Sequence, residues 1–345
     1  MSVTVMRFNL VEPSATRASL AARYRAALEM AAYADDHGLT AVQTEEHHGC
    51  PDNWIPSPLS FAGAVLGATR RLTVTVSAAI GPLYDPLRLA EDIAVLDLLS
   101  GGRLVTVVGV GYRPEEYARA GVDFARRGRL QDELLATLLA AWTGEEFTHR
   151  GRIVRVTPRP FSDPHPPLMV GGASRPAARR AARFGLPFFP SAHLPELAAY
   201  YEAASAARGG GGFVVMPAPR THLIHVAERP ERVWAEYGGH FLHEARTYAC
   251  RQPDGQRTAV RSVARTVEEL RAEGVYRVLT PQECVELAAQ DSAATVLHPL
   301  VGGMPPEEGW RGVRLFCERV LPRLRERAGD PGPSRPGRAS GGADR

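Results

Sequence analysis

The chain alternates between short runs of β-branched and apolar residues and longer segments whose apolar residues recur every three or four positions. The first pattern is typical of strands and the second of amphipathic helices. Eight strand-like runs follow one another, at 3–10, 39–44, 72–79, 103–110, 167–171, 186–190, 221–227 and 294–297. Helical patterns lie between and after them, at 20–37, 57–69, 86–99, 130–142, 174–184, 195–207, 231–249, 281–290 and 305–327.

Two stretches interrupt this alternation. Residues 112–166 and 251–276 lack a regular pattern and indicate insertions, except that the first contains the predicted helix at 130–142. For the second, a broken helix is an alternative that the pattern leaves open. Local signals are clearer elsewhere, since Ser57 and Pro58 indicate an N-cap and a first helical position.

Strands that alternate with helices favour a parallel α/β architecture. Eight such units predict a (β/α)8 TIM barrel with insertions rather than an open doubly wound sheet. An open sheet that binds a dinucleotide would carry a G-x-G-x-x-G motif directly after its first strand, and this chain has none there. We therefore expect residues 1–328 to form one barrel and 329–345 to form a disordered tail rich in Gly, Pro and Arg.

Composition narrows the class of protein. The chain has 345 residues, of which 44% are hydrophobic, and a formal net charge of +3. No apolar run approaches the roughly 18 residues of a membrane span, and the first ten residues alternate like a strand, so we expect neither a membrane protein nor a signal peptide. Four scattered cysteines without a C-x-x-C pair favour a reduced, cytoplasmic protein without zinc.

All 41 basic residues are arginine. The absence of lysine excludes a Schiff-base lysine, a lysine base and the lysine of a Walker-A loop. The arginines are dispersed among acidic residues, so no basic stripe for nucleic acid is predicted.

Three polar side chains follow the second predicted strand, and they are Glu46, His47 and His48. In a (β/α)8 barrel the carboxyl ends of the strands carry the catalytic residues. Histidine and glutamate there can transfer protons at the mouth of a pocket. The alternative is that these residues only mark the place where a strand meets solvent, and the local sequence leaves both interpretations open.

The fifth predicted strand runs into Gly171, Gly172, Ala173, Ser174 and Arg175, where a helix begins. Glycines let backbone N–H groups approach an anion closely, and a helix N-terminus adds free amides and a positive dipole end. A phosphate-binding loop needs this arrangement. The alternative is a tight turn with an ordinary serine cap, although two glycines exceed what a turn requires.

Small residues also end the third and fourth predicted strands. Gly109, Val110 and Gly111 end the fourth, where alternate glycines would let a flat ring lie against the backbone. A bulge or close strand packing is the alternative. Ser77 and Ala78 end the third, where small side chains would keep the mouth of the barrel open.

One helical spacing imitates a metal site. His240, His243 and Glu244 lie at positions i, i+3 and i+4 of a predicted helix. Because no strand supplies a further ligand, we interpret these residues as a solvated polar face and predict no metal centre.

Together these motifs resemble the bacterial-luciferase-like family of flavin-dependent monooxygenases. The resemblance runs from residue 3 to about 327, and the order and spacing of several blocks carry it. The blocks are 46–48, 96–103, 109–111, 171–174, 181–187 and 297–306.

The resemblance implies a luciferase-like barrel, often a homodimer, that binds reduced FMN supplied by a separate flavin reductase. It implies that O₂ adds to the flavin as a C4a-peroxide, which oxygenates a small organic substrate in a pocket that excludes water. His47 matches the family's catalytic histidine, and Glu46 can orient the histidine pair. The loop 172–174 matches the part that holds the FMN phosphate, and Ser77-Ala78 matches a strand end that often carries a cis peptide.

The chain departs from luciferase at the phosphate. Luciferase has an arginine at the position of Val110, so Arg113 or Arg175 would substitute here, or neutral donors would suffice. Relatives that transfer hydride with the deazaflavin F420 more often carry an Asp-His pair in place of Glu46-His47, which favours FMN in this chain. A non-catalytic flavin-binding protein is the remaining alternative, and His47 and the complete eight-strand pattern argue against it.

Overall fold

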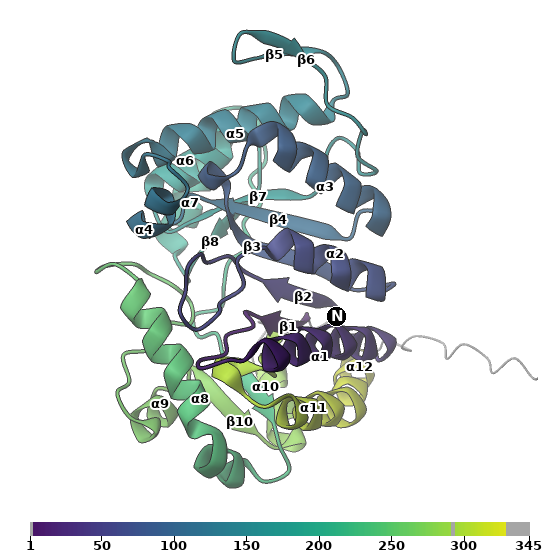
Figure 1. The fold of residues 1–345 in the computed structure, drawn as a ribbon, viewed down its shortest axis with the longest axis vertical. Coiled ribbons are helices and arrows are strands. Elements are labelled where there is room, and N and C mark those ends of the chain that lie inside the picture. Colours follow the sequence, from purple (N-terminus) through teal and green to yellow (C-terminus); the bar gives the residue numbers. More distant parts are fainter. Residues whose placement is uncertain (1–2, 291–293, 329–345) are drawn as a thin grey trace, which may run out of the picture.

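The computed structural model describes residues 3–290 and 294–328. Its main sheet is parallel and has nine strands in the order β10-β9-β11-β1-β2-β3-β4-β7-β8 (Figure 1). The strands are β1 (Thr4–Phe8), β2 (Ala41–Thr44), β3 (Thr73–Ile80), β4 (Leu104–Gly109), β7 (Leu168–Gly172), β8 (Phe188–Pro190), β9 (Leu223–Val226), β10 (Tyr276–Leu279) and β11 (Thr295–Leu297).

Eight of these strands coincide with the eight that the sequence predicts, and the α/β architecture is confirmed. The ninth, β10, was not predicted. It pairs with β9 and is the last strand at that edge of the sheet. The first strand, β1, pairs with both β2 and β11, as a barrel requires. Among the described residues no ladder joins β10 to β8, so complete closure of the barrel stays a prediction.

Helices connect the strands and pack on the outside of the sheet (Figure 1). They are α1 (Arg17–Asp36), α2 (Pro58–Ala68), α3 (Pro86–Ser100), α4 (Pro114–Arg119), α5 (Arg127–Trp142), α6 (Arg175–Phe184), α7 (Pro195–Ala206), α8 (Pro230–Arg251), α9 (Val267–Glu273), α10 (Pro281–Gln290), α11 (Pro306–Leu315) and α12 (Leu321–Ala328). None of the helices described is long and apolar enough to cross a membrane.

The structure refines three of the predicted boundaries. Ser57 does precede α2, but its side chain forms no capping hydrogen bond. The predicted helix at 305–327 consists of α11 and α12 joined by a π-helical turn, Phe316–Val320. Asp85 caps α3 by accepting hydrogen bonds from two backbone N–H groups, and Gly101 ends that helix with φ of 64°.

The two predicted insertions contain regular structure. Residues 112–166 hold α4, α5 and a hairpin of β5 (Phe147–His149) and β6 (Arg152–Val154), which projects from the molecule (Figure 1). Residues 251–276 hold α9 and the start of β10. The predicted disordered tail, 329–345, lies outside the described residues.

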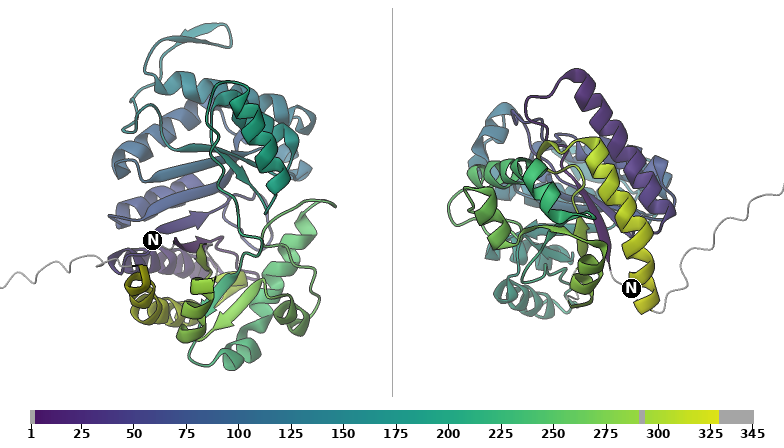
Figure 2. Two further views of the ribbon diagram at one scale, coloured as in Figure 1. Left: turned by 180° about the vertical axis from the view of Figure 1, so that it is seen from behind. Right: turned by 90° about the horizontal axis from the view of Figure 1, so that it is seen from below.

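The two ends of the described chain lie side by side. Figure 2 shows the last helices (yellow) next to α1 (purple). The ring of Tyr33 in α1 packs edge-on against Trp310 in α11 at 5.6 Å, and the Tyr33 hydroxyl donates to Glu318 at 2.8 Å. Because β1 also pairs with β11, both sheet and helices join the N-terminal to the C-terminal part.

Alternation along β1 separates the apolar core from a buried charge. Met6 and Phe8 are fully buried in the core between sheet and helices. Their neighbour Arg7 points to the other face, as the two-residue period of a strand requires, and it is 5% exposed. A buried guanidinium needs opposite charges nearby, because removal from water disfavours any isolated charge.

Glu244 of α8 supplies one of these charges, and its position corrects the predicted solvated face. The Glu244 side chain is completely buried, and it accepts hydrogen bonds from Arg7 at 3.0 Å and from the Gly302 backbone N–H at 2.9 Å. Its Oε1 lies 2.7 Å from His298 Nε2. Burial alone would raise the pKa of Glu244, but His298 and Arg7 outweigh it and hold the pKa well below its usual range.

Replacement of Glu244 tests this network. Glu244→Leu removes the acceptor of Arg7 Nη1 and of the Gly302 N–H, and we expect it to lower the free energy of unfolding by about 3–5 kcal/mol. The control is Glu236→Leu on the same helix, which removes an exposed ion pair with Arg232 and should cost no more than about 1 kcal/mol. Equal losses in urea unfolding would contradict a structural role for the buried pair.

Candidate active site at the carboxyl ends of the strands

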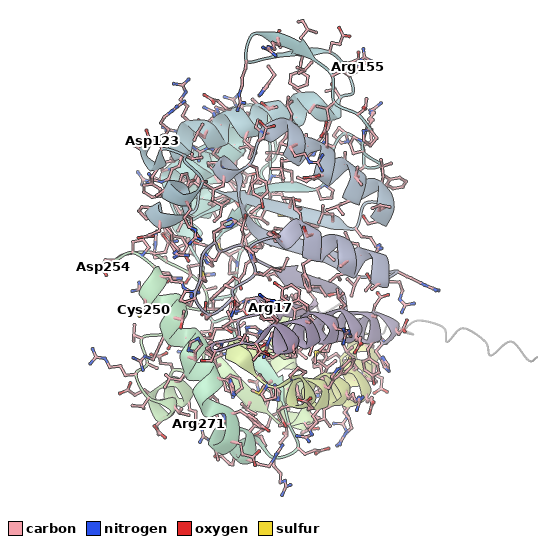
Figure 3. The ribbon with its side chains drawn as sticks, in the orientation of Figure 1. Arg17, Asp123, Arg155, Cys250, Asp254 and Arg271 are labelled. Carbon is pink, nitrogen blue, oxygen red and sulfur yellow. The ribbon has the colours of Figure 1, made fainter. Side chains whose placement is uncertain are left out.

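A cavity of about 1330 Å³ lies at the carboxyl ends of the strands. It extends from there along the face of the sheet to which Arg7 points. It exceeds the usual range of ligand pockets, about 300–1,000 Å³, so a cofactor and a substrate have room in it together. Figure 3 shows Asp123, before α5, and Asp254, after α8, on one side of the molecule. The neighbours of each aspartate in the chain contribute to the cavity wall.

The cavity brings together most of the residues that the sequence singled out. Those that line it are Glu46, His47, Ser77, Ala78, Gly109, Val110, Gly111, Gly171, Gly172, Ala173 and Ser174. His48 and Arg175 are not part of its described wall.

His47 is paired with a carboxylate that no sequence motif indicated. Its Nδ1 lies 3.0 Å from Oε1 of Glu116, which belongs to the first turn of α4. Glu116 is 1% exposed and also accepts from the His48 backbone N–H and from Arg113. Burial alone would raise the pKa of Glu116, but the hydrogen bond from His47 and these other donors outweigh it and lower the pKa.

This pairing orients the imidazole of His47. A carboxylate at Nδ1 favours the tautomer with its proton on Nδ1. In that tautomer Nε2 is an acceptor of hydrogen bonds. The Tyr112 hydroxyl lies 3.3 Å from Nε2. Burial raises the pKa of Tyr112, so its hydroxyl stays protonated and can donate to Nε2.

Aromatic rings surround the same imidazole. Trp54 packs edge-on against His47 with ring centroids 5.1 Å apart, and Tyr248 stacks on Trp54 at 5.8 Å. Trp54 is 2% exposed, so one side of His47 is shielded from water. The segment around Trp54 is tied to α8, because Asp52 accepts from Arg251 at 2.5 Å.

Glu46 holds His48 rather than His47. Its Oε1 lies 2.8 Å from His48 Nε2 and accepts from the Tyr84 hydroxyl at 2.8 Å, and its Oε2 accepts from the Ile80 backbone N–H at 2.7 Å. The hydrogen bond to Glu46 raises the pKa of His48, although partial burial acts in the opposite direction. Glu46 therefore fastens the end of β2 to the end of β3.

One glycine of the predicted phosphate loop has a backbone conformation and a close neighbour that other residues would not accommodate. Gly172 has φ of 149°, and a Cβ there would come within 2.8 Å of the Ala177 side chain. Ser174 is the N-cap of α6 but makes no capping bond through its side chain. Pro176 has no N–H, and the amides of Ala177 and Ala178 donate to the Ser174 carbonyl at 3.0 and 3.1 Å. Among the described residues the Arg175 amide is therefore the first one of α6 that is available to an anion in the cavity.

Two arginines that the sequence pattern did not indicate line the same cavity as this loop. Arg127 begins α5 and Arg180 lies in α6. Arg180 donates to Asp132 at 2.5 Å, and Arg183 also lies 2.7 Å from that carboxylate. One aspartate thus faces two guanidinium groups, so one of their two positive charges is not neutralised by it.

The two arginines that the sequence did propose have other contacts. Arg113 donates to Glu116 at 3.0 Å and to the His48 carbonyl at 3.2 Å. The guanidinium of Arg175 lies over the ring of Tyr200 at 5.6 Å. The side chain of Arg175 is therefore not directed at the predicted phosphate site. Its backbone N–H, at the first position of α6, lies where the prediction requires a donor.

Gly109 ends β4 and Gly111 follows it, and the two glycines have different roles. Gly111 has φ of 62°, and a Cβ there would lie 2.9 Å from Cγ2 of Ile80, so the turn itself requires glycine. A Cβ at Gly109 would only touch Ala78 at 3.5 Å, which is ordinary contact. The peptide between Ser77 and Ala78 is cis, as the resemblance implies.

The wall of the cavity also carries charges that were not predicted. Arg7 and Glu45 both line it, with Arg7 Nη2 donating to Glu45 at 2.6 Å. An arginine inside an apolar strand was a visible signal for Arg7. Among the residues described, no group of three or more His, Cys, Asp or Glu side chains is placed to hold a metal ion.

Comparison with known proteins identifies relatives of the chain. The profile of the luciferase-like monooxygenases matches residues 2–297. The 4-hydroxyprotoasukamycin monooxygenase of Streptomyces nodosus subsp. asukaensis is 28% identical over 325 residues, which cover 86% of each chain. The FMNH₂-dependent dimethylsulfone monooxygenase of Pseudomonas putida is 28% identical over 169 residues, 47% of this chain and 46% of the relative.

A solved structure agrees over most of its length. The monooxygenase RslO1 of Streptomyces bottropensis superposes with a TM-score of 0.70 and 26% identity, covering 93% of this chain and 99% of that one. The chain spans about half the length, 50–58%, of three other curated relatives that it matches.

Proposed function

Because the chain belongs to the luciferase-like monooxygenase family, we propose that it binds reduced FMN from a separate flavin reductase and uses O₂ to oxygenate a small organic substrate. The observation that carries the proposal is one cavity that holds both the His47–Glu116 pair and the glycine loop before α6. The name of the P. putida relative supports reduced FMN as the cofactor.

The cavity fits the FMN phosphate at the start of α6. Backbone amides of Gly172, Ala173 and Ser174 would hold the phosphate, with the dipole of a ten-residue helix behind them. Arg127 and Arg180 would supply the positive charge that luciferase takes from an arginine at the position of Val110. A dianion needs such charges, because it leaves water when it binds.

The ring of FMN fits between the ends of β3 and β4. Ser77, Ala78 and Gly109 present small side chains or none to this part of the cavity, so a flat ring can approach the backbone. His47 and Tyr112 line the same cavity from the segments that follow β2 and β4. A substrate would therefore meet the ring and the imidazole together.

Reduced flavin, when bound, supplies the electrons that activate O₂. The chain's own contribution is to place His47 with Nε2 facing the cavity beside the Tyr112 hydroxyl, where it can give or take a proton, while Glu116 fixes Nδ1. Trp54 and Tyr248 exclude water from this side. Apolar wall residues such as Phe189 and Met216 favour a substrate with an apolar body.

The phosphate assignment is tested by a change at the cap of α6. Ser174→Asp keeps a good N-cap but adds a negative charge, so we expect the FMN dissociation constant to rise at least about tenfold, or 1.4 kcal/mol. Riboflavin, which lacks the phosphate, should change little. Ser174→Asn is the neutral control and should leave both affinities unchanged. Fluorescence titration measures all of these constants.

The same titration distinguishes the cofactors. F420 titrated into the unaltered chain should bind more weakly than FMN. Tighter binding of F420 would contradict the FMN proposal and favour hydride transfer without O₂. Equal losses of FMN and riboflavin in Ser174→Asp would place the phosphate elsewhere.

His47 is proposed to serve the oxygen chemistry rather than flavin binding. His47→Ala should keep FMN affinity within a few-fold, because the phosphate is held by a loop on another strand. Loss of an acid/base group typically lowers the rate by about 10²–10⁴. With reduced FMN, O₂ and a substrate found by screening, the variant should yield mainly H₂O₂. His149→Ala, in the projecting hairpin, is the control. An unchanged product yield in His47→Ala would contradict a catalytic role for His47, which would then only mark the polar end of a strand.

The resemblance and one surface support a homodimer. Val95, Leu98 and Leu99 of α3 are 42%, 43% and 75% exposed, and a second copy that packs here would remove them from water.

The free cysteines Cys50, Cys250, Cys284 and Cys317 support a reducing, cytoplasmic setting.

Light scattering tests the assembly. We expect a mass of twice 37.4 kDa for the chain and a lower mass for Leu99→Arg. Ile153→Arg, on the hairpin, replaces an apolar residue that is 67% exposed and should keep the dimer. A monomeric mass for the unaltered chain would refute the proposal.

A further inference from the structure

One amide side chain in the cavity wall has no partner. Gln131 of α5 is 0% exposed, and both its Oε1 and its Nε2 lack a hydrogen bond among the described residues. It nevertheless lines the cavity. A buried amide that is unpaired at both ends destabilises a fold, so a glutamine here calls for a ligand that both donates and accepts.

The surroundings of Gln131 favour an apolar residue at this position. Leu134, Leu135 and Leu138 on the same helix are buried, and α5 packs there against the turn after β3. Gly81 in that turn leaves room for the amide, since a Cβ on Gly81 would lie 2.4 Å from Gln131 Oε1. Leucine would extend the apolar cluster, whereas glutamine brings an amide to the cavity.

The position of Gln131 indicates which part of a flavin it meets. It lies one helical turn after Arg127 and Gly128, which line the cavity beside the proposed phosphate site. On its other side it approaches Gly81, which directly follows β3. The end of β3 before Gly81 lines the cavity where the ring is proposed to lie. The ribityl chain joins phosphate to ring, and each of its hydroxyl groups can donate and accept.

We infer that Gln131 binds the ribityl hydroxyls of FMN, with Oε1 accepting from one hydroxyl and Nε2 donating to another. This inference rests on the proposed function. Gln131 is then a binding residue that helps to set how far the ring reaches toward His47.

The test compares three flavins with the purified full chain. Gln131→Leu should weaken FMN and riboflavin about tenfold, which corresponds to about 1.4 kcal/mol. Lumiflavin has the ring but no ribityl chain, and its affinity should stay within about twofold. Without ligand, the melting temperature of Gln131→Leu should equal or exceed that of the unaltered chain, because an unpaired amide is removed.

Two further variants make the comparison robust. Gln131→Asn keeps an amide but shortens the side chain by one methylene. This variant should bind FMN and riboflavin more weakly, although the residue stays a polar amide. Thr137→Val is the control, because Thr137 is buried on the same helix and bonds to the Glu133 carbonyl away from the cavity wall. It should bind all three flavins like the unaltered chain.

The outcomes separate this inference from the proposed function. If the unaltered chain binds flavins and both Gln131 variants bind them equally well, the contact is refuted and the proposed function stands. Equal losses for all three flavins would place Gln131 against the ring and refute the ribityl contact. If the unaltered chain binds none of the three, the proposed function fails, and this contact fails with it.

Discussion

The structure depends on carboxylates that are buried where the strands end. Glu46, Glu116 and Glu244 are each 3% exposed or less, and a charge so far from water must be paired. Each lies within hydrogen-bond distance of a histidine, which are His48, His47 and His298 respectively. Each also binds a backbone N–H of a distant segment. These pairs therefore hold the loops above the sheet in one arrangement.

That arrangement is also what gives the cavity its chemistry. The Glu116 carboxylate comes from α4, in the insertion after β4, and it reaches across to the end of β2. It fixes the orientation of His47, and the aromatic ring of Trp54 shields that imidazole. The same insertion supplies Arg127 and Gln131 through α5. A segment that interrupts the repeating fold thus builds much of the candidate site.

The sequence predicted what depends on local pattern. Eight strands could be located because each is a short apolar run, and the glycine loop before α6 was recognised from adjacent residues. The partners of His47 and Arg7 could not be predicted, since Glu116 lies 69 residues and Glu244 lies 237 residues away in the chain. Helical spacing likewise gave no sign that Glu244 faces inward, because its burial depends on Arg7 of another element.

The central claim is that this cavity binds FMN with its phosphate at the start of α6 and its ring beside His47. A crystal structure of the chain with FMN tests it most directly. The account predicts the phosphate against the amides of 172–174 with Arg127 and Arg180 nearby, and the ring over the Ser77–Ala78 peptide. FMN bound away from α6, or a ring that lies on a face remote from His47, would contradict it.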